Sequence, residues 1–136
     1  MDRQEAIEYL LEHYENPRNN GPMEDADVTM PGGNPGCGDV VTLYVKLNEA
    51  GDHVDRVTFE GQGCTISQAA ASILTEMVEG KPLSEIDEMD FNDMIDELGR
   101  EVVSNRPRCA TLALGTLKAA IAKYRNDQVR ADLAQS

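Results

Sequence analysis

The sequence predicts an α+β domain in which helices pack on one face of a small antiparallel sheet. Two stretches between residues 40 and 60 alternate apolar and polar residues, which is typical of strands. From residue 66 onward, apolar residues recur at three- and four-residue spacing, which is typical of helices with one buried face. Because strands come first and helices mostly follow, the order favours α+β over alternating α/β organisation.

The N-terminal segment, residues 2–15, predicts a helix. Asp2 and Glu5 have the spacing of a capping box, and Asn16-Pro17 ends the helix. Its expected buried face consists of the apolar residues at helical spacing: Ile7, Leu10, Leu11 and Tyr14. His13 is expected to be exposed on the polar side of this helix.

Three strands are expected next, over residues 26–30, 40–47 and 54–60. The first is a short extended stretch within a segment rich in Gly, Pro and Asn. The second places Val41, Leu43, Val45 and Leu47 on one face. The third places Val57 and Phe59 on one face, and Arg56, Thr58 and Glu60 on the other. A short turn containing Gly51 joins the last two strands, so we expect an antiparallel hairpin.

Four more helices are predicted, over residues 66–78, 84–89, 90–98 and 110–124, which makes about five in all. Gly80 and Pro82 end the first of these four. The last has its buried stripe at Leu114, Leu117, Ile121 and Tyr124. Residues 126–136 are polar, so we expect one domain over residues 1–125 and a C-terminal tail after it.

The formal net charge of −13 bears on possible partners. Nucleic acids and anionic membranes are recognised by clustered Lys and Arg, so neither is expected as a partner. No apolar run approaches the roughly 20 residues needed to cross a bilayer, and the cytoplasm is the expected location. The acidity suits either a basic protein partner or life in concentrated salt.

Three cysteines, Cys37, Cys64 and Cys109, are too few and too widely separated for a disulfide framework. Each lies at a junction between elements. Cys37 is in the glycine-rich stretch "NPGCGDV" before a strand, Cys64 follows a glycine before a helix, and Cys109 follows "NRPR" before the last helix. The alternative interpretation is three small buried residues, but those would more commonly lie within an apolar stripe.

Such positions favour metal chemistry. A helix N-terminus favours thiolate over thiol, and Arg106 and Arg108 add positive potential beside Cys109. Asp39 lies two residues after Cys37, so on an extended segment both side chains point the same way. Three thiolates and one carboxylate make a four-ligand set for zinc or for an iron–sulfur cluster.

The sequence contains few residues that could form other kinds of active site. The two histidines are His13, on a helix, and His53, which is expected to be solvated in the hairpin turn. A Ser-His-Asp or Cys-His hydrolase is therefore not indicated. Neither GxxxxGK[ST] nor GxGxxG is present, so a phosphate-binding loop is not indicated either.

Four motifs in order resemble the iron–sulfur cluster assembly scaffold family, the group of IscU, SufU and the NifU N-terminal domain. They are "HYENPRN" before a glycine-rich segment, "CGD" before a strand, "GQGCTIS" before a helix, and Arg-x-x-Cys at the start of the last helix. The resemblance covers residues 1 to about 125. It implies a three-stranded antiparallel sheet with helices on one face and a metal site at one end.

The resemblance also implies a function and site residues. A family member is a scaffold, not an enzyme: it receives persulfide sulfur from a cysteine desulfurase, assembles a labile [2Fe-2S] cluster and passes it to apo-proteins. Carried over to this sequence, Cys37, Cys64 and Cys109 are thiolate ligands and sulfur acceptors. Asp39 is the carboxylate ligand that keeps the cluster transferable. A monomer or a weak homo-oligomer is expected.

Two departures from the IscU pattern leave alternative functions open. Arg108 stands where IscU-type members have a histidine, and "VSNRPR" stands where they have a Leu-Pro-Pro-Val-Lys segment read by an Hsp70-type chaperone. Arg106, three residues before Cys109, resembles the SufU type, although the SufU insertion is missing. The second hypothesis is therefore a zinc-dependent persulfide acceptor that activates a desulfurase. A third is a purely structural zinc domain.

Overall fold

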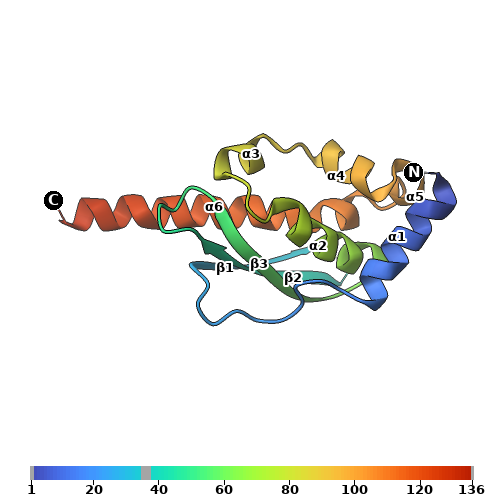
Figure 1. Cartoon of the computed structure of the whole chain (residues 1–136), viewed down its shortest axis with the longest axis horizontal. Coiled ribbons are helices and arrows are strands. Elements are labelled where there is room, and N and C mark those ends of the chain that lie inside the picture. Colours follow the sequence, from blue (N-terminus) through green and yellow to red (C-terminus); the bar gives the residue numbers. More distant parts are fainter. Residues whose placement is uncertain (1, 35–37, 136) are drawn as a thin grey trace.

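A three-stranded antiparallel sheet and the helices that cover one of its faces form two layers (Figure 1). The structure is a computed structural model that describes residues 2–34 and 38–135. The strands are β1 (Val28–Asn34), β2 (Asp39–Leu47) and β3 (Val54–Gln62), in the order β1-β2-β3. The predicted α+β class and the β2–β3 hairpin are confirmed.

The buried face of the sheet is the one predicted for β2. Val41, Leu43, Val45 and Leu47 are all buried and alternate with more exposed residues. Strand β1 extends past its predicted end because it pairs with β2 as far as Asn34 opposite Asp39. Gly32 in β1 has no room for a side chain, since a Cβ atom there would lie 2.0 Å from Oγ1 of Thr116 on α6. Only glycine lets β1 approach the last helix so closely.

Six helices are present among the described residues: α1 (Arg3–Glu15), α2 (Thr65–Val78), α3 (Leu83–Glu88), α4 (Phe91–Leu98), α5 (Arg100–Val103) and α6 (Pro107–Gln135). Helices α2 and α6 contact the sheet, and α1 packs on α2. The four-residue α5 was not predicted. Helix α6 continues beyond the predicted end at Tyr124, because no glycine or proline follows Gly115. Its C-terminal end extends beyond the sheet in Figure 1.

The buried face of helix α1 was predicted only in part. Ala6, Leu10 and His13 are buried, whereas Leu11 and Tyr14 are about half exposed. The prediction that His13 is exposed is therefore wrong. Nδ1 of His13 lies 2.8 Å from Oγ of Ser72 on α2, so this polar ring has a buried partner. On the same face, Ala6 packs closely against Gly99. Glycine allows this approach, because a Cβ atom on Gly99 would lie 2.6 Å from Cβ of Ala6.

The connection from α1 to β1 covers the other face of the sheet (Figure 1). Thr58, predicted to lie on a polar face, is only 2% exposed. Among the described residues, no helix combines the length and the apolar character needed to cross a membrane.

The outer edge of β3 is bonded at two places by segments that are not strands. The backbone N–H of Phe59 donates to Asn19, and the N–H of Gly21 donates to the carbonyl of Phe59. Near the start of β3, the N–H of Val54 donates to Lys81, and the N–H of Gly80 donates back to the carbonyl of Val54. This edge therefore has backbone partners near both of its ends.

Candidate metal centre

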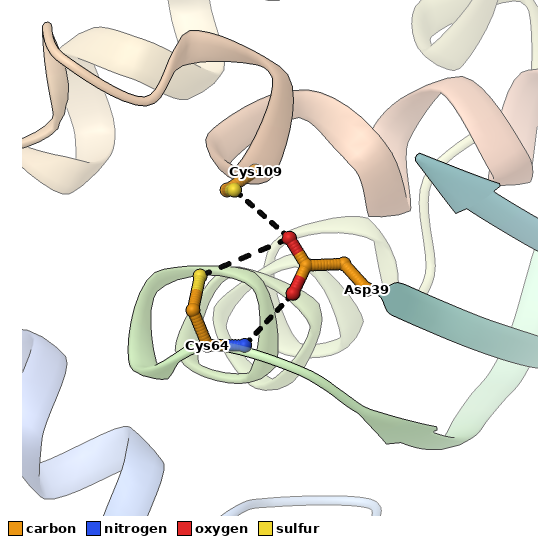
Figure 2. A group of neighbouring side chains, drawn as sticks. All are labelled: Asp39, Cys64 and Cys109. Atoms are coloured by element: carbon orange, nitrogen blue, oxygen red, sulfur yellow. Dashed lines mark hydrogen bonds between the residues drawn. The ribbon is translucent and has the colours of Figure 1, made fainter. Parts of the chain in front are cut away.

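Three of the four predicted ligands meet at one end of the sheet (Figure 2). Asp39 is the first residue of β2, Cys64 is the N-cap of α2, and Cys109 lies in the first turn of α6. One ligand atom from each residue can be chosen so that all lie within 4.8 Å of one another. The fourth predicted ligand, Cys37, lies outside the described residues.

The junctions that hold these side chains depend on local chain signals. Gly63 joins the end of β3 to α2 with φ of +150°, a conformation that side chains other than glycine rarely adopt. A Cβ atom there would lie 2.2 Å from Oδ1 of Asp39, so the glycine also makes room for the carboxylate. Pro107 begins α6 at the position where a missing N–H costs least, and this places Cys109 in the first turn.

The two oxygens of the Asp39 carboxylate have different partners (Figure 2). Oδ1 accepts a hydrogen bond of 2.8 Å from the backbone N–H of Cys64. Oδ2 faces the thiols: it lies 2.9 Å from Sγ of Cys109, which donates to it, and 3.9 Å from Sγ of Cys64. One oxygen is thus tied to the backbone, and the other lies between the sulfur atoms.

Burial and hydrogen bonding shift the pKa values of two of these groups. For Asp39, burial alone raises the pKa, but hydrogen bonds from Cys109, Cys64 and Ser67 together with the charge of Arg106 lower it overall. Burial, then hydrogen bonds to Asp39 and Cys64, raise the pKa of Cys109 to about 12. The sequence argument predicted a thiolate here, and for Cys109 in the metal-free protein that prediction is wrong. Desolvation and the neighbouring carboxylate outweigh the helix N-terminus.

The two predicted supporting arginines lie in different surroundings, and both are exposed. The positive charge of Arg106 lowers the pKa of Asp39, so it acts on the centre electrostatically. Arg108 lines a groove beside α6 together with Gly32, Phe91 and Thr111. The positive potential that Arg108 is expected to add beside Cys109 remains a prediction.

One residue of the centre was missed. Ser67 is 3% exposed, and its hydroxyl donates to the carbonyl of Cys64 at 3.0 Å. Its Oγ is also 3.8 Å from Sγ of Cys64. A signal was present in "GCTIS", since a serine three residues after an N-cap residue points back to the first turn of the helix.

This donor set suits a metal ion of intermediate hardness. Thiolates are preferred by zinc and by iron in iron–sulfur clusters, while carboxylates are harder ligands. Cys109 and Asp39 are 3% and 2% exposed, so two of the three groups are almost fully screened from solvent. The three groups come from distant parts of the chain and are brought together by the fold itself.

The family described as "NifU-like N terminal domain" matches residues 5–131 of the chain. The chain belongs to this family. The resemblance stated from the four motifs is thereby confirmed, and the match includes all four predicted ligand positions.

Named relatives of this NifU-like domain are scaffold proteins. The chain is 39% identical over 130 residues to the iron-sulfur cluster assembly scaffold protein IscU of Aquifex aeolicus, covering 96% of this chain and 82% of the relative. It is 37% identical over 122 residues to the Escherichia coli IscU scaffold, covering 88% and 93%.

A solved structure shares the fold. The putative iron-sulfur cluster assembly scaffold protein for the SUF system from Fervidobacterium islandicum superimposes with a TM-score of 0.69 at 30% sequence identity. The match covers 84% of this chain and 94% of that one.

Proposed function

We propose that this NifU-like domain is an iron–sulfur cluster assembly scaffold. In this role it assembles a labile [2Fe-2S] cluster on Cys37, Asp39, Cys64 and Cys109 and transfers it to recipient apo-proteins. The observation that carries the proposal is the convergence of Asp39, Cys64 and Cys109 from three separate elements, with ligand atoms within 4.8 Å. The scaffold names of the relatives support the same role.

The sulfur would come from a cysteine desulfurase. One of the three cysteines, as its thiolate, attacks the outer sulfur of the desulfurase persulfide, and the desulfurase thiolate leaves. The new persulfide is then on the scaffold, beside the position where iron binds. We place this chemistry in the cytoplasm, where thiols stay reduced.

The carboxylate has a distinct part in this proposal. A hard oxygen ligand is displaced from iron more easily than a fourth thiolate. Asp39 therefore makes the cluster transferable, while the cysteines hold it during assembly. Hydrogen bonds from Cys109 and from the backbone N–H of Cys64 lower the pKa of Asp39, and the charge of Arg106 adds to this, so the ionised, metal-binding form is favoured.

Anaerobic reconstitution with iron and inorganic sulfide tests the proposal directly. We expect the visible absorbance of a [2Fe-2S] cluster, followed by its appearance on an apo-ferredoxin when the two proteins are mixed. Replacing any of Cys37, Cys64 or Cys109 with Ser should abolish or strongly reduce the absorbance. If the protein forms no cluster, the scaffold proposal is wrong.

A zinc-bound persulfide acceptor is the second candidate, because Arg106 stands three residues before Cys109, the spacing that resembles the SufU type. In that mode zinc holds the thiolates until a partner group displaces one. Metal analysis of the purified protein and a desulfurase activity assay separate the candidates. One bound zinc, a faster desulfurase and no cluster would favour the second candidate over the first.

A further inference from the structure

Ser67 is a buried polar residue in the first turn of α2, three residues after Cys64. Its hydroxyl has more than one partner in the candidate metal centre. It donates to the carbonyl oxygen of Cys64 at 3.0 Å and lies 3.8 Å from the sulfur of Cys64. Ser67 thus contacts the predicted ligand Cys64 without being a member of the ligand set.

A neighbour holds the Ser67 hydroxyl from the other side. The side-chain amide of Gln68 donates to Oγ of Ser67 at 3.4 Å. The hydroxyl is therefore fixed within the first turn of α2 and cannot turn towards solvent, because its side chain is almost completely covered. A hydroxyl held in this way can orient the groups that it touches.

The orientation of the Asp39 carboxylate depends on the first turn of α2. Its Oδ1 is tied to the backbone N–H of Cys64, at the same turn where Ser67 bonds the Cys64 carbonyl. Only Oδ2 lies between the two sulfur atoms. The first turn of α2 therefore decides which carboxylate oxygen faces the thiols.

We propose that Ser67 is a positioning residue that keeps Asp39 a one-oxygen ligand. By fixing the first turn of α2, whose Cys64 N–H holds Oδ1, it leaves Oδ2 alone to bind a metal ion. This inference rests on the proposed function, because it assumes that the three side chains bind metal.

The consequence is a defined coordination number. Three thiolates and a single carboxylate oxygen give four ligands, the number that zinc and cluster iron adopt with sulfur-rich sets. If the carboxylate were free to rotate, both of its oxygens could bind, and the centre would gain a fifth ligand. Ser67 thus acts on the geometry of the centre through Asp39 and Cys64.

Cobalt(II) is a suitable probe because it takes the place of zinc and its ligand-field absorption reports geometry. Tetrahedral cobalt absorbs more strongly than five-coordinate cobalt. The full-length protein and its Ser67→Ala variant would be titrated with cobalt(II) under anaerobic conditions. Affinity is measured by competition with a chromophoric chelator, and thermal unfolding is measured on the metal-free proteins.

The matched control is Ser72→Ala. Ser72 is on the same helix, is fully buried, and has hydrogen-bond partners of its own in His13 and the backbone N–H of Arg18. It makes none of the described contacts with the metal centre. The control thus removes another buried serine hydroxyl from α2, at a position where only the stability of the fold should change.

We expect Ser67→Ala to bind cobalt(II) about 10- to 100-fold more weakly than the unmodified protein, the usual effect of removing an outer hydrogen-bond partner of a metal ligand. Its ligand-field absorption per bound cobalt should also be weaker. Ser72→Ala should keep the affinity and the spectrum while its metal-free form unfolds at a lower temperature.

Three results would overturn the inference. If Ser67→Ala matches the unmodified protein in affinity and spectrum, Ser67 positions nothing, although the proposed function stands. If both serine variants lose affinity equally, the effect is one of general stability. If the unmodified protein does not bind cobalt(II) through its thiolates, the proposed function fails and the inference fails with it.

Discussion

At Asp39, the assignment of one carboxylate oxygen to the backbone and the other to the thiols gives this residue two tasks. Oδ1 fixes the turn that leads into α2, and in the proposed function Oδ2 is the oxygen presented to the cluster. The first task is structural, while the second would set how easily a bound cluster leaves. A substitution at this position therefore affects the fold and the lifetime of the cluster in separable ways.

Asp39→Ala should lengthen the lifetime of a reconstituted cluster several-fold, because the ligand that is most easily displaced is gone. The measurement is the decay of cluster absorbance after a chelator is added. Asp27→Ala is the matched control: Asp27 accepts a hydrogen bond from the N–H of Leu47 at the opposite end of the sheet. Faster cluster loss in Asp39→Ala than in Asp27→Ala would contradict the argument.

Thr58 is a second residue with a testable consequence. Its hydroxyl is buried and has no hydrogen-bond partner among the described residues. Thr58→Val, which keeps the shape and removes the unpaired group, should stabilise the protein by about 1 kcal/mol. Urea unfolding measures the change.

Thr75→Val provides the control for Thr58→Val. The Thr75 hydroxyl donates to the carbonyl of Ser72 at 2.7 Å and accepts from Asn19 at 3.0 Å. The same substitution there removes two hydrogen bonds and should destabilise the protein. A loss of stability in both variants would show that removing the unpaired Thr58 hydroxyl brings no gain in stability.

Between elements, His13 makes the contact of α1 with α2 sensitive to pH. Burial and the charge of Arg18 lower the pKa of His13, and Glu76 and Glu12 oppose this in part. The folded state therefore prefers the neutral ring. Since the unfolded chain takes up the proton more readily, stability should be full above the ordinary histidine pKa of about 6.5 and be lost as the pH falls below it.

Urea unfolding at pH 5 and pH 8 tests this expectation. The unmodified protein should be less stable at pH 5, and His13→Asn should show a smaller difference between the two values. His53→Asn is the control, because His53 is exposed and its ring pairs with the side chain of Asp52 in the turn between β2 and β3. An unchanged pH difference in His13→Asn would place the acid sensitivity elsewhere.

Helix α6 divides into a packed part and an exposed part. Leu114, Leu117 and Ile121 are buried, whereas residues 125–134 are exposed. We expect a chain ending at residue 125 to fold and to assemble a cluster, as the predicted domain over residues 1–125 requires. Thermal unfolding and reconstitution of this shortened chain are the measurements. Loss of cluster assembly with the fold intact would assign residues 126–136 a part in the function.

The strands and the packed helices were predictable because their apolar periodicity is regular. Val41 to Leu47 in β2 and Leu114 to Ile121 in α6 follow it closely. The buried face of α1 was not predictable in the same way, because a pattern of apolar residues takes no account of a buried histidine. His13 is buried through its bond to Ser72, a contact between residues distant in sequence, and no local pattern reports such a partner.

The candidate site was predictable for a different reason. Its cysteines occupy junctions, where a structural cysteine is uncommon, and their motifs occur in a fixed order. What the sequence did not reveal is the internal arrangement, such as the two roles of the Asp39 oxygens. That arrangement depends on the meeting of three elements, and so does the raised pKa of Cys109.

For the whole molecule, the net charge of −13 predicts a salt-dependent stability. Repulsion among like charges destabilises the compact state, and salt screens it over about 10 Å at 0.1 M and about 3 Å at 1 M. The midpoint of thermal unfolding should therefore rise with sodium chloride concentration. A variant with Glu88 and Glu101 changed to Lys should respond less. A midpoint that falls as salt is added would contradict this.

The bonded outer edge of β3 has a consequence for how the protein behaves in a crowded solution. An open strand edge offers N–H and C=O groups to any other extended chain, including a second copy, and so invites sheet growth between molecules. Here Asn19 to Gly21 and Gly80 to Lys81 take up backbone groups of Phe59 and Val54. These two loops contribute no ligand to the metal centre, and by taking up backbone groups of β3 they oppose sheet growth from this edge.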